Sequence, residues 1–245
     1  SLFGLIFLSS VFLLIAILIK RESPGPVFFR GPRVGRRGRL FTILKFRTMF
    51  EPPAGGNGSP LTCSEDERVT PLGQWLRDTK INELPQLWNV LKGQMSLVGP
   101  RPEDPLFVEK WPAPARDLIL SVRPGITSPA SVSYRDEQQQ LVGTDVVNSY
   151  LEHIAPDKLR LDLLYIQHRS FLVDLDIIFM TFILLLPLLR KVDLPERTFF
   201  SGPIFQFFRR FLSWFIIDAL VALFNISIAI LLWRLVTPLD LGWQL

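Results

Sequence analysis

The sequence contains very little cysteine and carries little net charge. Its 245 residues include one cysteine, Cys63, which excludes an intramolecular disulfide and leaves the redox compartment open. The formal net charge is only +4. Against these small numbers, 48% of the residues are hydrophobic and the mean hydropathy is +0.28. This composition argues against an ordinary soluble enzyme, and we expect a membrane protein.

No small-residue cleavage site follows the apolar run at the N-terminus, which argues against a cleaved signal peptide. The run, Leu2 to Ile19, is uncharged for about 18 residues, near the lower limit for crossing a bilayer. Lys20 and Arg21 follow directly and predict a cytoplasmic C-terminal end. The hydroxyls of Ser9 and Ser10 can bond to carbonyls one turn earlier and bend the helix, so spanning and re-entry both stay open. Because the chain starts inside this run without a methionine, we expect the full protein to begin earlier.

Basic residues are crowded into one early stretch, although the net charge is small. They are Lys20, Arg21, Arg30, Arg33, Arg36, Arg37, Arg39, Lys45 and Arg47. Such a patch suits anionic lipid headgroups, nucleotide phosphates or nucleic acid, and it also fits a solvated loop beside a membrane segment. The patch has no platform of paired aromatic residues for base stacking, so we predict no nucleic-acid partner.

The following region predicts a polar domain of short mixed elements. The stretches "PVFFRG" and "LFTILKFRTM" are typical of two short strands joined by the turn "GPRVGRRGR". Thr70 and Pro71 predict a helix start, with Thr70 as the N-cap and Leu72, Trp75 and Leu76 on the apolar face.

The densest stretch is "KINELPQLWNVLKGQMSLVGPRP", residues 80 to 102. The spacing predicts a helix whose core face carries Leu84, Leu87, Trp88 and Leu91 and whose other side carries Glu83, Gln86 and Asn89. Asn82 stands at the predicted N-cap. The amides and dipole of this helix end could seat a phosphate, or Asn82 could merely cap the helix while Glu83 complements the dipole.

Three arginines flank turns or helix ends and suggest an anionic ligand. Arg77 ends the predicted helix after Thr70, and Arg101 and Arg123 stand in "GPRP" and "RPG", where proline fixes the backbone. Guanidinium groups bind phosphate in a bidentate manner. Each arginine alone could equally form a surface salt bridge, but together with Lys45 and Arg47 they favour a polyanion.

Four ordered blocks carry a resemblance to a known family. They are "GPVFF" with "ILKFRTM", then "DERVTPLGQWLR" continuing into "KINELPQLWNVLKGQMSLVGPRPE", then "VRPGIT", and finally "LDLLYIQHRSFLVDLDII". Together they cover roughly residues 1 to 190 and resemble the bacterial sugar transferases, the monotopic phosphoglycosyl transferases.

The resemblance implies transfer of a phosphosugar from a UDP-sugar to undecaprenyl phosphate, with Mg²⁺, release of UMP and a role in starting surface glycan assembly. It places the enzyme in the bacterial inner membrane with the active site facing the cytoplasm and the lipid bilayer as a partner. Glu83 would help to hold the metal. The remaining implied site residues are the catalytic Asn82 and Arg77 and the substrate-binding Lys45, Arg47, Arg101, Pro102 and Arg123. Asp162, Tyr165, Ser170 and Asp174 match a further block, in which we expect Asp162 to be structural.

The chain departs from the family pattern in two functional places. The family has an Asp-Glu dyad whose Asp is the nucleophile, and here the dyad is Asn82-Glu83. An amide is a poor nucleophile and brings no charge to a metal, so three explanations stay open: direct transfer to the lipid phosphate, a substitute carboxylate such as Asp78, or an inactive form. The last would make the chain a catalytically silent membrane scaffold or regulator. "RPGITSPASVSYRDE" replaces "RPGITGWAQV", so the donor sugar stays open as well.

The C-terminal part predicts further membrane contact. Ile177 to Leu189 is about 13 apolar residues long and favours an interfacial helix over a core helix, whereas Phe211 to Trp233, about 23 residues, could span. Asp218 and Asn225 share one face of that helix, so a homodimer or additional membrane helices are expected. The predicted fold is α/β, mostly helical, and membrane-associated. The resemblance implies that the N-terminal helix re-enters the membrane, so the predicted parts are a re-entrant helix at 1–20, a catalytic domain at 21–175, an interfacial region at 176–200 and a transmembrane segment at 201–245.

Overall fold

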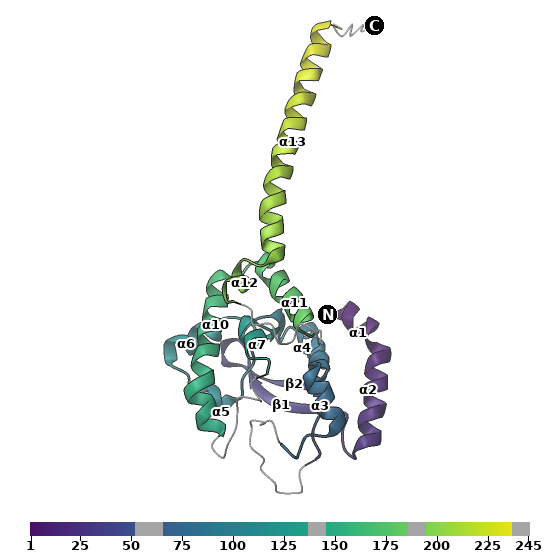
Figure 1. Ribbon diagram of the computed structural model, residues 1–245, viewed down its shortest axis with the longest axis vertical. Coiled ribbons are helices and arrows are strands. Elements are labelled where there is room, and N and C mark those ends of the chain that lie inside the picture. The colour runs from purple at the N-terminus through teal and green to yellow at the C-terminus, as the bar shows by residue number, and fades with distance from the viewer. Residues whose placement is uncertain (52–65, 137–145, 186–194, 237–245) are drawn as a thin grey trace, which may run out of the picture.

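The computed structural model describes residues 1–51, 66–136, 146–185 and 195–236, which form a mostly helical body from which one long helix projects (Figure 1). The helices are α1 (Leu2–Phe7), α2 (Ser9–Glu22), α3 (Pro71–Asp78), α4 (Leu87–Leu91), α5 (Pro105–Val108), α6 (Ala113–Ile119), α7 (Pro129–Ser133), α9 (Val146–Ser149), α10 (Ala155–His168), α11 (Phe171–Leu185), α12 (Arg197–Phe200) and α13 (Pro203–Val236). The strands are β1 (Phe28–Val34), β2 (Leu40–Phe46), β3 (Ser96–Val98) and β4 (Gly125–Thr127). The remaining elements are two short 3₁₀ helices, η1 (Arg36–Gly38) and η2 (Ile81–Gln86), and a π-helical turn, η3 (Tyr150–Ile154).

The N-terminal apolar run is broken into two helices. The break falls at Leu8, and the hydroxyl of Ser9 donates to the carbonyl of Ile6 at 2.8 Å, which confirms the predicted serine bend. Ile15 and Ile19 in the second piece are buried against Phe46 of β2, whereas Phe3 and Phe7 of α1 are more than four-fifths exposed, at 88% and 84%. α2 therefore packs against the body of the protein, whereas α1 leaves large apolar side chains exposed.

The predicted hairpin is confirmed. β1 and β2 pair antiparallel with Phe28 opposite Phe46, and the connecting turn places Arg37 and Gly38 at positive φ, 59° and 72°. The Phe46 ring stacks on Phe28 with centroids 5.4 Å apart. The predicted helix after Thr70 is also confirmed, since α3 starts at Pro71 and the Thr70 hydroxyl accepts from the Gly73 amide. Both β2 and α3 also contact η2, so they position residues 81 to 86.

Residues 80 to 91 differ from the prediction in both cap and face. Lys80, at φ 56°, takes the N-cap position of η2, and Asn82 lies inside this short 3₁₀ helix, so the predicted Asn82 cap and the anion seat based on it were wrong. The expected polar face is the buried one, because Glu83, Gln86 and Asn89 are 8%, 1% and 2% exposed. The expected core residues Trp88 and Leu91 are 45% and 43% exposed.

Hydrogen bonds to β2 explain this inversion. The side-chain amide of Asn89 donates to the Thr42 carbonyl at 2.8 Å and its Oδ1 accepts from the Leu44 amide at 3.1 Å. Asn89 thus satisfies the main-chain groups on the edge of β2 that β1 does not pair. Partners in β2 and in the turn after β3 offset the desolvation cost of burying Glu83 and Asn89, whereas the buried Nε2 of Gln86 has no hydrogen-bond partner.

The C-terminal helices pack onto the body through α11. This helix starts at Phe171, earlier than the predicted Ile177, and buries Val173, Ile177 and Met180 while Phe179 and Phe182 are 41% and 67% exposed. The predicted end of this segment, 186 to 189, and Cys63 lie outside the described residues. α13 contains the whole predicted span, and within the described ranges it is the one helix that is long and apolar enough to cross a membrane by length and composition.

Asp176 fastens α13 to α11. Its fully buried carboxylate accepts from the amides of Ile204 and Phe205 at 2.8 and 2.9 Å, which satisfies two of the unpaired donors at the start of α13. Gly202 lies so close that a Cβ would come within 2.5 Å of the Asp176 carboxylate.

Replacing Asp176 with alanine is expected to loosen this junction. Two charge-assisted hydrogen bonds are lost and two amides stay unpaired, which costs about 2–4 kcal/mol. The midpoint of thermal unfolding in detergent should fall by roughly 4–16 °C. Asp117→Ala, at a side chain that is 78% exposed, is the matched control and should leave the midpoint unchanged. A shift of the same size in both variants would show that the Asp176 contact does not hold the two helices together.

Candidate functional site

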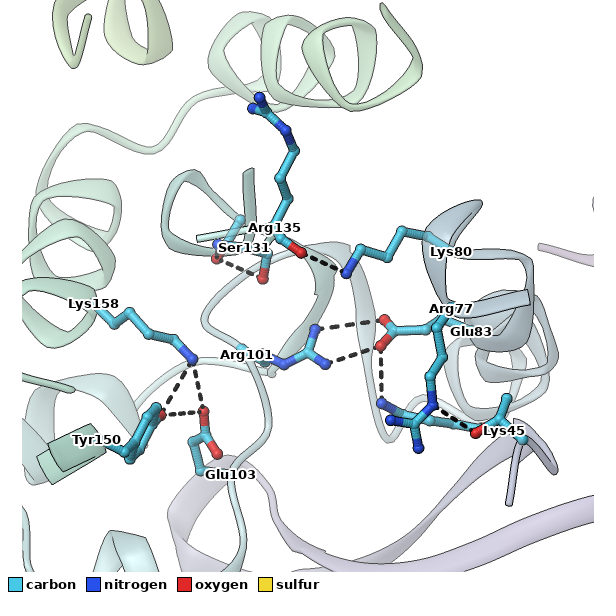
Figure 2. Close-up of polar contacts among 12 residues, drawn as sticks. Lys45, Arg77, Lys80, Glu83, Arg101, Glu103, Ser131, Arg135, Tyr150 and Lys158 are labelled. Atoms are coloured by element: carbon cyan, nitrogen blue, oxygen red, sulfur yellow. Dashed lines mark hydrogen bonds and ion pairs between the residues drawn. The ribbon is translucent and has the colours of Figure 1, made fainter. Parts of the chain in front are cut away.

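The centre of the site is the carboxylate of Glu83 in η2. It accepts from the Lys45 ammonium of β2, with Nζ 2.8 Å from Oε1. The Arg101 guanidinium, in the turn after β3, grips the same carboxylate with Nη2 2.9 Å from Oε1 and Nη1 3.5 Å from Oε2. Figure 2 shows these two cations converging on Glu83 from different elements. The fold therefore brings together Lys45 from one predicted block and Glu83 and Arg101 from opposite ends of the next.

The electrostatics of this cluster are set by burial and by the excess of cations. Burial alone would raise the pKa of Glu83, but the charges of Arg101, Lys45 and Lys80 outweigh it and hold that pKa well below its usual range. Burial lowers the pKa of Lys45 to about 8, although Glu83 opposes the shift. The Glu83 carboxylate is therefore ionised at neutral pH, whereas the Lys45 ammonium titrates at a pH only slightly above neutral.

Asn82 and Arg77 bring unsatisfied polar atoms to the same region. Asn82 is 9% exposed and its Oδ1 has no hydrogen-bond partner. The Arg77 Nε donates to the Thr48 hydroxyl at 2.8 Å, but its buried Nη1 has no partner. Burial lowers the pKa of Arg77, and the negative charges of Asp66 and Glu83 offset only part of this shift. Buried polar atoms are normally paired, so these two atoms are available to a ligand.

The other predicted substrate-binding residues lie in different settings. Arg47 is 6% exposed and its guanidinium donates to the carbonyls of Ser23 and Pro24 at 2.8 and 2.7 Å, so it ties the end of α2 to β2. Pro102 is buried beside Arg101 and shapes that turn. Arg123 is exposed before β4, and its main-chain oxygen lies next to Gly99. The described contacts therefore place Lys45, Arg77, Asn82, Glu83 and Arg101 in one region and give Arg47 a different set of partners.

Asp78, named as a substitute carboxylate, and Asp162 each have contacts of their own. Asp78 is exposed and accepts from the Gln74 amide at 3.1 Å, one turn earlier on α3. Asp162 is buried next to Ser128 and Lys158, and burial raises its pKa to about 7. In the rest of its block, the Tyr165 hydroxyl donates to Asp174 at 2.8 Å, a contact that joins α10 to α11.

Two cations of the site were not predicted from the sequence. Lys80 acts on the charge of Glu83 and donates to the Arg135 carbonyl at 2.9 Å. Arg33, in β1, is paired with Asp104 at 3.2 Å, and the charges of Arg101 and Glu83 act on its pKa, which burial lowers. Only the position of Lys80 two residues before Asn82 could have indicated it, because Arg33 is one of many arginines in its stretch.

Comparisons with known proteins show the family of the chain. Residues 1–187 match the profile of a protein family described as "Bacterial sugar transferase". The chain is 37% identical over 191 residues to an undecaprenyl-phosphate glucose phosphotransferase of Komagataeibacter xylinus, covering 74% of this chain and 33% of that protein. It is 39% identical over 175 residues to a UDP-N-acetylgalactosamine-undecaprenyl-phosphate N-acetylgalactosaminephosphotransferase of Aeromonas hydrophila, covering 71% of this chain and 38% of that protein.

A shorter relative is matched over most of its length. The exopolysaccharide production protein ExoY of Sinorhizobium fredii is 36% identical over 195 residues, covering 74% of this chain and 79% of that protein. The chain thus spans about a third of the length of the two longer relatives. With the family profile covering residues 1–187 of the chain, this protein belongs to the bacterial sugar transferase family.

Proposed function

We propose that the protein is a phosphoglycosyl transferase that moves a sugar phosphate from a UDP-sugar to undecaprenyl phosphate and releases UMP. The observation that carries the proposal is the cluster of Lys45, Glu83 and Arg101 in a chain of this family. Phosphoryl transfer depends mainly on positioning and charge neutralisation, and this cluster, with Arg77 beside it, supplies fixed cations for a diphosphate. The names of the two longer relatives support the substrates.

The proposed reaction is a direct transfer. An oxygen of the lipid phosphate attacks the β-phosphorus of the UDP-sugar, a new P–O bond forms, and the bond to the bridging oxygen breaks, so that UMP leaves with that oxygen. Arg101 and Lys45 would neutralise the diphosphate, and Arg77 would use its free Nη1 on a phosphate oxygen. No proton has to move from the lipid phosphate dianion, so the reaction needs no general base.

The position of Asp78 supports direct transfer over a substitute nucleophile. Asp78 is exposed and bonded to Gln74, whereas Arg77, its neighbour in the chain, reaches Thr48 on the inner side of α3. Asn82 cannot serve, because an amide attacks phosphorus poorly. A nucleophile on the lipid itself removes the need for a carboxylate at position 82.

The oxygens at residues 82 and 83 also fit a role for Mg²⁺. Among the described residues no group of three or more Asp, Glu, His or Cys could hold a metal, so the protein alone would bind it weakly. Mg²⁺ is commonly held by one or two protein oxygens together with substrate phosphates. The Glu83 carboxylate and the unpartnered Oδ1 of Asn82 would supply those oxygens. When bound with the diphosphate, the ion would neutralise part of its charge.

The outer surface supports a membrane setting. Phe3, Trp88 and Leu91 are exposed, and α1 packs beside α4, so apolar side chains gather at that corner of the body. α13 projects from the same end of the body (Figure 1). We propose that α1 re-enters the inner membrane from the cytoplasmic side, that α13 spans it, and that the site faces the cytoplasm. The silent scaffold suggested by Asn82 finds no support among the relatives, since both longer ones are named as phosphotransferases.

A product assay tests the proposed activity. The purified chain, in nanodiscs with undecaprenyl phosphate and Mg²⁺, is incubated with a panel of UDP-sugars, and lipid extracts are analysed by mass spectrometry. We expect undecaprenyl diphosphate sugar from at least one donor. A panel in which every donor fails, with correctly folded protein, would remove the proposed function.

The buried ammonium of Lys45 predicts a specific pH dependence. Lysine is cationic below its pKa, so the affinity for UDP should fall as the pH rises through about 8, where Lys45 loses its charge. Lys45→Arg should remove this fall, since arginine stays protonated. The measurement is UDP titration by calorimetry across the range, with Lys110→Arg, at an exposed lysine, as the control. An unchanged profile in Lys45→Arg would show that another group titrates.

A further inference from the structure

A second pair of cations lies at the edge of the site, apart from the two that grip Glu83. Lys80 begins η2 with a left-handed backbone at φ 56°, a conformation that costs energy in a residue other than glycine. Its ammonium donates to the main-chain oxygen of Arg135 at 2.9 Å, and its charge lowers the pKa of Glu83. Lys80 therefore links the Glu83 region to the chain that follows α7.

The side chain of Arg135 has a direction of its own. Figure 2 shows it extending away from Glu83 and Arg101, toward the helices drawn above it. Its Nε is buried and makes no hydrogen bond, although it lies 3.5 Å from the Asp136 carboxylate, which offsets part of its charge. The ion pair with Asp136 leaves this nitrogen without a hydrogen bond, so it can still donate to an acceptor on a ligand.

The helix α7, which precedes Arg135, packs on an apolar element. α7 packs on α11, where Val132 shares a cluster with Met180 and Leu184. The outer face of α11 exposes Phe179 and Phe182, and α13 projects from this end of the body (Figure 1). Lys80 therefore acts on the Glu83 cluster, and Arg135 follows α7, which packs on α11, a helix with exposed apolar side chains.

We propose that Lys80 and Arg135 bind the phosphate of the acceptor lipid. Direct transfer requires two phosphate groups to be held at once, and the Lys45, Glu83 and Arg101 cluster accounts for the diphosphate of the donor only. A lipid phosphate has a charged head and an apolar chain, which match the cation pair and the adjoining surface of α11. The identity of this ligand rests on the proposed function, but its binding can be measured without turnover.

The test compares three ligands on the full chain in detergent by calorimetry: farnesyl phosphate, UDP and inorganic phosphate. Arg135→Gln and Lys80→Gln are each expected to lower the affinity for farnesyl phosphate about tenfold. The affinity for UDP should stay within about twofold of the wild-type value. Arg135→Lys should restore most of the affinity, and Arg39→Gln, at an exposed arginine of the hairpin, should change neither ligand. Unchanged UDP binding also shows that the variants fold.

Three results would overturn the proposal. An equal or larger loss of UDP affinity would assign the pair to the donor. An unchanged affinity for farnesyl phosphate in Arg135→Gln would place the acceptor lipid elsewhere. Inorganic phosphate that binds as tightly as farnesyl phosphate, with the same dependence on Arg135, would show a general phosphate site. A wild type without turnover but with Arg135-dependent farnesyl phosphate binding would defeat the transfer reaction and leave this lipid-phosphate site standing.

Discussion

Replacing Glu83 with glutamine is expected to reduce turnover by at least about 100-fold, the range seen when one fixed charge-stabilising group is removed from an active site. Glutamine keeps the size of the side chain and one acceptor oxygen, but it removes the charge that Lys45 and Arg101 share. Because Glu83 raises the pKa of Lys45 against the effect of burial, its loss should lower that pKa further and reduce the positive charge on Lys45 near neutral pH. The variant then lacks an anion for a metal and has less positive charge for the diphosphate.

The measurement is initial-rate UMP release with undecaprenyl phosphate and the preferred UDP-sugar. Glu109→Gln, at an exposed glutamate, is the matched control and should keep the wild-type rate. Circular dichroism of Glu83→Gln checks that the helices are retained. A rate within tenfold of the wild type in a folded Glu83→Gln variant would mean that this carboxylate is not at the reacting centre.

Replacing Asn82 with aspartate is expected to change the course of the reaction. Residue 82 is buried beside Glu83, and its Oδ1 has no partner, so a carboxylate there would be available to attack phosphorus. A carboxylate oxygen would bond to the β-phosphorus of the UDP-sugar, and UMP would leave with the bridging oxygen. Asn82→Asp should therefore release about one UMP per enzyme without any lipid acceptor and gain the mass of a sugar phosphate.

Intact-protein mass spectrometry checks this expectation. The double variant Asn82→Asp with Glu83→Gln should lose the adduct, since the nucleophile alone lacks the charge arrangement around Glu83. The wild type should show no adduct under the same conditions. An adduct on the wild-type chain would show that another side chain already serves as the nucleophile, and direct transfer would be abandoned.

Local signals in the sequence predicted several elements well. The hairpin, the helix capped by Thr70 and the serine bend at Ser9 each depend on neighbouring residues, and each is confirmed. The mostly helical fold with small strands is confirmed in part, whereas membrane association and the four domain boundaries stay predictions. Helix periodicity failed at residues 80 to 91, because Pro85 lies in a 3₁₀ helix and partners distant in the chain bury the polar side chains.

The candidate site shows the same division between local and distant information. The resemblance pointed to Lys45, Glu83 and Arg101, which the fold joins, but it could not show that Arg47 turns toward Ser23. Lys80 was missed because its conformation at φ 56° depends on the end of α3 and on Arg135. The assignment of roles to Arg123 and Pro102 stays a prediction.

The dependence of UMP release on the lipid tests the central proposal most directly. The wild-type chain is incubated with Mg²⁺ and each UDP-sugar, with and without undecaprenyl phosphate, and UMP and lipid-linked sugar are counted together. Direct transfer predicts that UMP appears only with the lipid and in a one-to-one ratio to the lipid product. Silence of the wild type with every donor, while Asn82→Asp turns over, would contradict it and would make the chain an inactive form of the enzyme.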